Sequence, residues 1–210
     1  MKKLLLISIP VLALLFAGCS TSKITDSWAT KQQLRSSENK ILVLGLFSEK
    51  NRDAKRAMEN ELASDLRKFG YNAVTATETF GPVAFRDMNE QQALQKLRDN
   101  GIENVVTINL LNKDQQKKYV PGTAYPPYSP FYGFNRFWGY YSYYQPFAYN
   151  RGYYKNSTNY YFETNLYNVN SNELIYSAQT KSFDPSSMRT LANDYARNVV
   201  RDMKKKNVLG

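Results

Sequence analysis

The sequence predicts an α/β fold with a mixed sheet of about five strands and three helices, in the order βαβαβββα. Three observations lead to this prediction: an apolar run of strand length over residues 41–47, two amphipathic helical patterns that each precede a β-prone stretch, and a hairpin pattern near the C-terminus. Strands connected through helices favour parallel pairing, whereas a hairpin adds antiparallel strands. A long aromatic loop is expected just before that hairpin.

The first strand and helix have the clearest patterns. Residues 41–47 read ILVLGLF, a continuous apolar run that suits a strand buried on both faces. In residues 51–69, apolar side chains recur every four positions from Ala54 to Leu66, which is typical of an amphipathic helix. Gly70 follows and suits the position just beyond a helix end.

The middle of the domain is predicted as a strand, a helix and a strand. Residues 72–79 are β-prone because they contain a valine and several threonines. Asn89 and Gln92 have the spacing of a capping box, so a second helix is expected to begin there and to end at Gly101. Residues 102–111 are the next predicted strand.

The C-terminal part is predicted as a hairpin and a final helix. Strands are expected at 159–169 and 173–183, joined by an Asn-Ser-Asn turn. Residues 184–187 are expected to open the last helix. Its buried side is predicted to contain five apolar or aromatic residues: Met188, Leu191, Tyr195, Val199 and Met203.

The N-terminus has the layout of a secretory signal peptide over residues 1–18. Lys2 and Lys3 form a short positive region, and the apolar run 4–16 is too short to span a membrane as a helix. Two small residues follow. We therefore expect export and removal of this leader.

The end of the leader, Leu15-Phe16-Ala17-Gly18-Cys19, resembles the lipobox of bacterial lipoproteins, with a phenylalanine where leucine is usual. The resemblance implies that Cys19 becomes the first mature residue and carries diacylglycerol and an N-acyl chain such as palmitate. No other cofactor and no metal are expected. Two or more acyl chains anchor a protein stably to a membrane. The alternative is a secreted protein with an unmodified cysteine.

The residues after Cys19 imply a location and a tether. In lipoproteins, a serine at the position of Ser20 implies the outer membrane, and the absence of an acidic cluster after it implies a periplasm-facing protein. Residues 19–40 are polar and are predicted to be a tether. Trp28 is the exception to this polar composition. It could pin part of the tether onto the domain as a short edge strand around residues 24–28.

Composition narrows the function. The formal net charge is +10, which favours acidic partners, although the basic residues are mixed with acidic ones as on a solvated surface. Nucleic acid is not an expected partner of an exported protein. The chain has no histidine and one cysteine, which excludes Ser–His and Cys–His catalysis, the usual zinc ligand sets and an internal disulfide.

The order of elements resembles the N-terminal domain of TolB and related envelope proteins, including LpoB and the core of CsgG, and also a set of uncharacterised envelope lipoproteins. The resemblance covers about residues 40–208 without the aromatic segment, so a single domain is expected at 41–208. It implies a non-catalytic domain that binds protein partners in the envelope. The matching segments are ILVLGLF, ELASDLRKFGY, DNGIENVVTINL and TNLYNVNSNELIYSAQT.

An aromatic segment occupies residues 121–155. It contains ten Tyr, four Phe and one Trp, with five Pro, four Gly and no acidic residue. This density of Pro and Gly argues against regular structure. Its rings could extend the core, contact the membrane surface, or bind a protein or glycan. The candidate partner contacts are Tyr132, Arg136, Trp138, Tyr140, Tyr141, Tyr143, Tyr144 and Arg151.

No motif for an active site is present. The loop after residue 47 lacks the glycines of a phosphate-binding loop, and no Gly-x-Ser-x-Gly occurs. A glycan hydrolase with two carboxylates could use Glu78, Asp87, Glu103 or Glu163. We expect a non-catalytic, membrane-anchored envelope lipoprotein that binds a protein or peptidoglycan. The alternatives are a cell-wall glycan hydrolase and a subunit of an oligomeric assembly.

Overall fold

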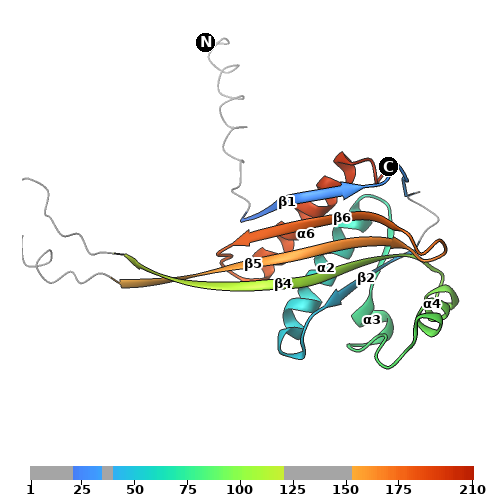
Figure 1. The fold of residues 1–210 in the computed structure, drawn as a ribbon, viewed down its shortest axis with the longest axis horizontal. Coiled ribbons are helices and arrows are strands. Elements are labelled where there is room, and N and C mark those ends of the chain that lie inside the picture. The colour runs from blue at the N-terminus through green and yellow to red at the C-terminus, as the bar shows by residue number, and fades with distance from the viewer. Residues whose placement is uncertain (1–20, 35–39, 121–152) are drawn as a thin grey trace, which may run out of the picture. The chain divides into compact units, whose positions relative to one another are not determined.

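The computed structural model describes residues 21–34, 40–120 and 153–210 (Figure 1). These residues belong to two compact units, one made of Met1–Lys113 with Asn159–Gly210 and the other of Asp114–Thr158. The elements, in chain order, are β1 (Ser22–Ala29), β2 (Lys40–Leu46), a 3-10 turn (Glu49–Asn51), α2 (Arg52–Lys68), β3 (Asn72–Thr75), α3 (Ala76–Phe80), α4 (Glu90–Asp99), β4 (Ile102–Val120), β5 (Tyr153–Asn168), β6 (Leu174–Phe183) and α6 (Met188–Lys205).

The described strands form one mixed sheet in the order β1-β6-β5-β4-β2-β3. β2 pairs in parallel with β3 and β4, whereas β6 pairs antiparallel with β5 and β1. The parallel pairs come from the two early helical crossovers and the β5–β6 pair from the predicted hairpin. The mixed α/β class is therefore confirmed, with one strand and one short helix more than predicted among the described residues.

The additional strand, β1, corrects the prediction of a continuous tether over 19–40. β1 pairs with β6 at the edge of the sheet, with a register shift between Ile24 and Asp26. Farther along, Leu34 is buried in the core and its amide donates to the carbonyl of Val208 (2.8 Å). An edge strand needs few apolar residues. The polar composition therefore predicted a tether, and only Trp28 indicated a strand, around residues 24–28.

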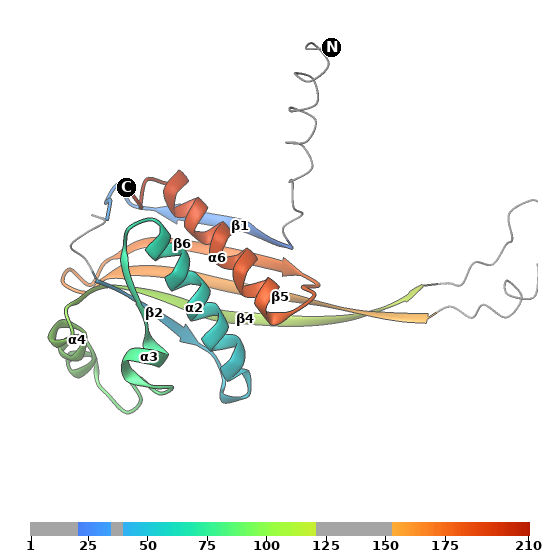
Figure 2. The ribbon, with the colours of Figure 1, turned by 180° about the vertical axis from the view of Figure 1, so that it is seen from behind.

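One face of the sheet is covered by α2 and α6, which pack against each other (Figure 2). Met58, Leu62 and Leu66 of α2 are fully buried there, as the four-residue spacing predicts. The predicted buried side of α6 is also confirmed: Leu191, Tyr195, Val199 and Met203 are buried, and Met188 packs against them partly exposed.

The opposite face of the sheet has a smaller core. Leu42 packs there with Leu97 of α4 and Ala76 of α3, whereas its neighbours Ile41 and Val43 face α2 and α6. This alternation confirms that β2 is buried on both faces. Helices α3 and α4 lie near β2 and β4, so no described helix covers β1, β6 and β5 on this side (Figure 1).

The cap predictions hold, but three strand boundaries differ. Asn89 and Gln92 form the capping box, and Ser187 caps α6. The predicted strand 72–79 is wrong after Thr75, because the Thr75 hydroxyl accepts the Glu78 amide and begins α3. β4 continues nine residues beyond its predicted end, and β5 begins six residues before its predicted start. The added residues of both strands are mostly polar, so no apolar pattern marked them.

The second unit is described at residues 114–120 and 153–158. The rings of Tyr119 and Tyr154 contact each other there in a tilted arrangement, with centroids 5.2 Å apart, and remain largely exposed. The first three residues of the β5 end, 153–155, belong to the segment predicted to lack regular structure, so that prediction is corrected there.

Candidate functional site

Most of the predicted site residues lie outside the described residues. Cys19 precedes them. The candidate contacts of the aromatic segment also lie outside them and remain predictions: Tyr132, Arg136, Trp138, Tyr140, Tyr141, Tyr143, Tyr144 and Arg151.

The four candidate carboxylates come from four different places in the fold. Glu78 is exposed on α3, and Asp87 is exposed in the loop before α4 with a positive φ of 61°. Glu103 lies at the start of β4, and Glu163 in β5 accepts from the Asn165 side chain (3.3 Å). None of them lines the cavity at the C-terminal end of β2. This cavity therefore does not supply the pair of carboxylates that the hydrolase alternative needs.

The cavity at the C-terminal end of β2 has a volume of about 480 Å³. Ligands of open α/β sheets commonly bind at this edge of the parallel strands. Its apolar lining includes Phe47, Val83 and Phe85. Its basic lining comes from four residues: Arg52, Lys55, Arg56 and Arg86.

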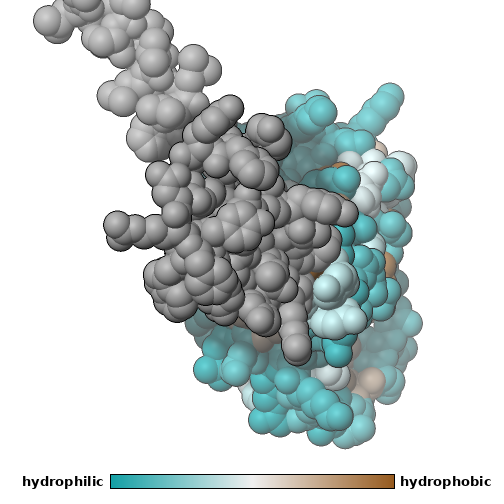
Figure 3. Space-filling model, turned by 90° about the vertical axis from the view of Figure 1, so that its left-hand side faces the viewer, coloured by the Kyte–Doolittle hydropathy of each residue, from teal (hydrophilic) through white to brown (hydrophobic). Residues whose placement is uncertain are grey.

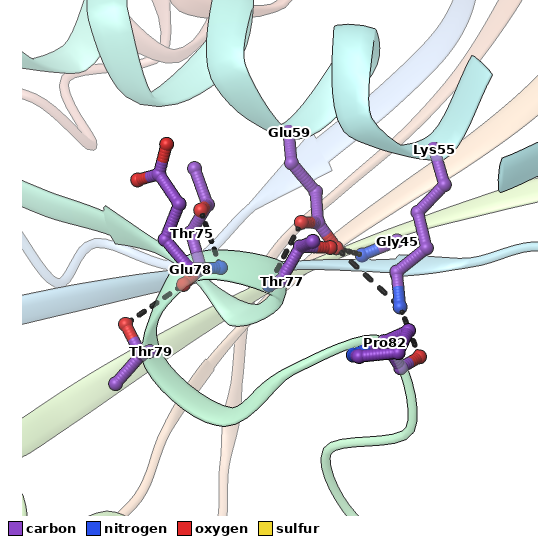
Figure 4. Close-up of polar contacts among 8 residues, drawn as sticks. All are labelled: Gly45, Lys55, Glu59, Thr75, Thr77, Glu78, Thr79 and Pro82. Carbon is purple, nitrogen blue, oxygen red and sulfur yellow. Dashed lines mark hydrogen bonds and ion pairs between the residues drawn. The ribbon is translucent and has the colours of Figure 1, made fainter. Parts of the chain in front are cut away.

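A buried carboxylate contacts three residues that line this cavity, Gly45, Lys55 and Thr77 (Figure 4). Glu59 of α2 is 0% exposed and accepts from the amides of Gly45 (2.8 Å) and Thr77 (3.1 Å). Lys55 lies 3.9 Å from the same carboxylate and donates to the carbonyl of Pro82 (2.9 Å). Glu59 thereby joins α2 to the end of β2 and the start of α3. These contacts indicate a structural role for Glu59.

Gly45 makes room for this arrangement. A Cβ atom at this position would lie 2.8 Å from Cγ of Lys55 and 3.1 Å from the Phe47 ring. The lysine stem therefore crosses β2 where there is no side chain. The glycine inside the apolar run ILVLGLF was the available signal for a close approach at this position, although not for its partner.

The mouth of the cavity is formed by an exposed ion-pair network. Glu49 pairs with Arg52 and with Arg86 (3.1 Å). The hydrogen bond from Arg52, followed by that from Arg86, lowers the pKa of Glu49. Exposed pairs of this kind contribute little to stability. Because one carboxylate faces two guanidinium groups and Arg56 adds a third, the mouth is positively charged.

A second surface is the part of the sheet that no described helix covers. We define the open face as six residues of β1, β5 and β6. Lys181 lies 4.9 Å from the ring centroid of Tyr161 and 4.7 Å from that of Phe183, and Lys23 lies 5.2 Å from the latter. Trp28 is 52% exposed and Phe183 is 40% exposed. The six residues are Lys23, Trp28, Tyr161, Gln179, Lys181 and Phe183.

The open face therefore carries aromatic rings and two lysines, and Asp26 of β1 and Glu163 of β5 lie on either side of Gln179 on the same face. On the side of the molecule shown in Figure 3, the visible described surface is mostly hydrophilic and hydrophobic residues occur singly. Exposed rings gathered on one sheet face are an arrangement that protein interfaces use. The sequence signal for this surface was the period-two alternation in β1 and β6. Using that signal would have required knowing the register in which the two strands pair.

Two further properties concern the described residues. They contain no group of three or more Asp or Glu that could hold a metal ion. Their helices are each too short or too polar to cross a membrane.

Comparison with known proteins gives low-level fold similarities. No family model matches the chain, and no curated protein matches it. Crystal structures of the PelC dodecamer from Paraburkholderia phytofirmans align with TM-scores of 0.45 and 0.44 at 13% identity, over 83% of this chain and 94% of theirs. The lipoprotein GNA1162 from Neisseria meningitidis aligns with a TM-score of 0.43 at 13% identity, over 80% of this chain and 99% of its own.

A third protein, a putative neuraminyllactose-binding hemagglutinin homolog from Helicobacter pylori, aligns with a TM-score of 0.37 at 10% identity, over 84% of this chain and 87% of its own. At these values the similarities carry no functional information for this chain. The resemblance to the TolB, LpoB and CsgG domains stays a prediction.

Proposed function

We propose that this chain is a non-catalytic envelope lipoprotein, anchored through Cys19 in the outer membrane and facing the periplasm, that binds a protein partner through its open face. The leader and the lipobox-like sequence support the location. The observation that carries the binding role is the open face itself, where the rings of Tyr161 and Phe183 lie together with two lysines and Trp28 is exposed farther along β1.

The side chains of the open face favour a protein partner over peptidoglycan. Aromatic rings provide large contact area at low entropic cost, and they dominate the energetics of many interfaces. Lys23 and Lys181 are directly opposite each other in the β1–β6 register and both face Phe183. With Asp26 and Glu163 on either side of Gln179, the face has mixed charge, which favours a protein surface with complementary acidic and basic groups.

The proposal is tested by site-specific photocrosslinking in intact cells. A photoreactive amino acid replaces Gln179, which is exposed in the centre of the open face. We expect one defined crosslinked species that is lost in the Trp28→Ala/Phe183→Ala variant, because that variant removes the exposed rings. The matched control replaces Gln91, which is exposed on α4, and should not give this species.

The outcomes separate the alternatives. A crosslink between two copies of this chain would favour a subunit of an oligomeric assembly. The same products at Gln179 and Gln91 would contradict binding through the open face. Release of glycan fragments from peptidoglycan by the purified protein, abolished by Glu163→Gln or Glu103→Gln, would instead establish the hydrolase alternative.

A further inference from the structure

The chain is fixed to the domain immediately after the predicted lipid-bearing residue. The amide and hydroxyl of Thr21 both donate to Oδ2 of Asp194 (2.9 Å each), and the Thr21 carbonyl accepts from the amide of Phe183 (2.7 Å). The Asn198 side chain donates to the carbonyl of Ser22 (2.6 Å). Thr21 therefore has no freedom to act as part of a tether.

This attachment limits the distance between the lipid and the domain. Cys19 precedes Thr21 by two peptide links, and consecutive Cα atoms are about 3.8 Å apart. The two Cα atoms can therefore be separated by at most about 7.6 Å. If Cys19 carries lipid, as the proposed function requires, the start of β1 is held against the bilayer surface.

A positively charged groove lies at this point, where β1 and α6 run side by side (Figures 1 and 2). Its volume is about 300 Å³. Arg201 and Lys205 of α6 are exposed on one rim and make no ion pair within the described part of the chain. The residues that line the groove are Ser22, Lys23, Ile24, Asn198, Arg201, Asp202 and Lys205.

The single carboxylate in the groove is already engaged. Oδ2 of Asp202 accepts a hydrogen bond from the hydroxyl of Tyr176 in β6 (2.8 Å), which holds it toward the core. Lys23 also lines the groove, but its ammonium lies over the Phe183 ring on the open face, on the other side of the sheet. The groove thus contains one engaged carboxylate against the two basic side chains of Arg201 and Lys205, and this balance favours an anionic occupant.

We propose that this groove binds the headgroup phosphate of an anionic phospholipid in the same bilayer that holds the anchor. The inference rests on the proposed lipid anchor and adds a second, non-covalent contact with the membrane. A guanidinium group suits phosphate because its donors match the phosphate oxygens in pairs. The position of the groove favours a lipid as the source of this phosphate. The groove is lined by the first residues of β1, which directly follow Thr21, and Thr21 is held close to the anchor.

The test uses a non-lipidated chain, residues 20–210, which retains every described residue. Its binding is measured by co-sedimentation with vesicles of phosphatidylcholine alone and of equimolar phosphatidylcholine and phosphatidylglycerol. We expect binding only to the second kind. Arg201→Gln/Lys205→Gln should lower the partition coefficient about 25-fold, because each basic residue near an anionic surface contributes roughly a fivefold factor.

The matched control is Lys50→Gln/Arg98→Gln, which removes the same charge from exposed positions on other elements. It should retain most of the binding. Equal losses in both double variants would mean that only net charge matters, and would overturn the groove. Displacement by inorganic phosphate, beyond the effect of chloride at equal ionic strength, would also overturn it, because the groove would then be a site for a free anion.

The anchor is tested separately by Cys19→Ser in cells. If that variant still fractionates with membranes and its leader is removed normally, the proposed lipoprotein function fails. The vesicle result would be unaffected, because it does not use the lipid. Conversely, a functional anchor together with equal binding of the groove and control variants would remove this inference alone.

Discussion

The Glu59 region and the β1–α6 groove use charge in opposite ways. Glu59 is fully buried, and its carboxylate accepts two backbone amides and pairs with Lys55. Arg201 and Lys205 are exposed and make no ion pair in the described residues. Both regions have more basic than acidic side chains nearby, so net charge alone does not distinguish them.

The difference shows how to separate structural charges from charges available to a ligand. A buried charge persists only where partners replace the water it has lost. An exposed cation keeps its hydration and gains from an anion that arrives later. We therefore expect substitutions in the Glu59 region to change the free energy of unfolding, and substitutions in the groove to change binding while leaving unfolding almost unaffected.

Glu59→Ala should have the largest effect on stability. It leaves the amides of Gly45 and Thr77 without their carboxylate and Lys55 without its ion-pair partner. Removing one partner of a buried pair costs about 3–5 kcal/mol. Urea unfolding followed by circular dichroism measures this change. Glu61→Ala, on the same helix but only partly buried, is the control and should lie within about 0.5 kcal/mol of the unmodified protein.

Two buried tyrosines give the next largest effect, through pH. Burial, followed by the charge of Asp202, raises the pKa of Tyr176, and burial raises the pKa of Tyr195. Both stay protonated in the folded chain when unfolded tyrosines ionise, above about pH 10. Because the unfolded state then binds fewer protons, stability should fall as pH rises, by about 2.7 kcal/mol per pH unit for the two groups.

Substitution identifies the source of this alkaline loss. Tyr176→Phe/Tyr195→Phe should be less stable near neutral pH, by about 1 kcal/mol per lost hydrogen bond, yet show a flatter decline above pH 10. Tyr153→Phe/Tyr154→Phe removes two exposed tyrosines and should keep the original slope. Parallel slopes in all three proteins would show that other groups control alkaline unfolding.

The sequence predicted the covered face of the sheet well because its signals are local. The spacing of Met58, Leu62 and Leu66 specifies which side of α2 is buried, and the Asn89 capping box marks where α4 begins. These patterns depend on residues three or four positions apart. Burial and capping at that range need no knowledge of the rest of the fold.

The groove could not be predicted because its parts are distant in the sequence. Asn198 contacts Ser22 across 176 positions, and β1 acquires its role only by pairing with β6. The polar composition of residues 22–29 resembles that of a tether. The same limitation concealed the Glu59 contacts, because the partners Gly45 and Thr77 come from segments on either side of α2.

Asn104 gives the smallest expected change in the free energy of unfolding, and it tests directly whether a buried polar group needs a hydrogen-bond partner. It lies in β4 within the segment NVVTI, pairs with Ile41 in the β2–β4 register, and is 0% exposed. Neither its Oδ1 nor its Nδ2 has a hydrogen-bond partner within the described residues. An unpaired buried polar group costs roughly 1–3 kcal/mol.

Asn104→Leu should therefore stabilise the protein by about 1–2 kcal/mol, since leucine has a similar volume and no polar atoms to desolvate. Thr75→Val is the matched opposite. Thr75 is equally buried, but its hydroxyl accepts from the Glu78 amide, so its replacement should destabilise by about 1 kcal/mol. Urea unfolding measures the change in the free energy of unfolding for both variants, and the two changes should have opposite signs. A less stable Asn104→Leu protein would mean that this side chain is paired after all, and that a buried polar group in this fold stays only where a partner holds it.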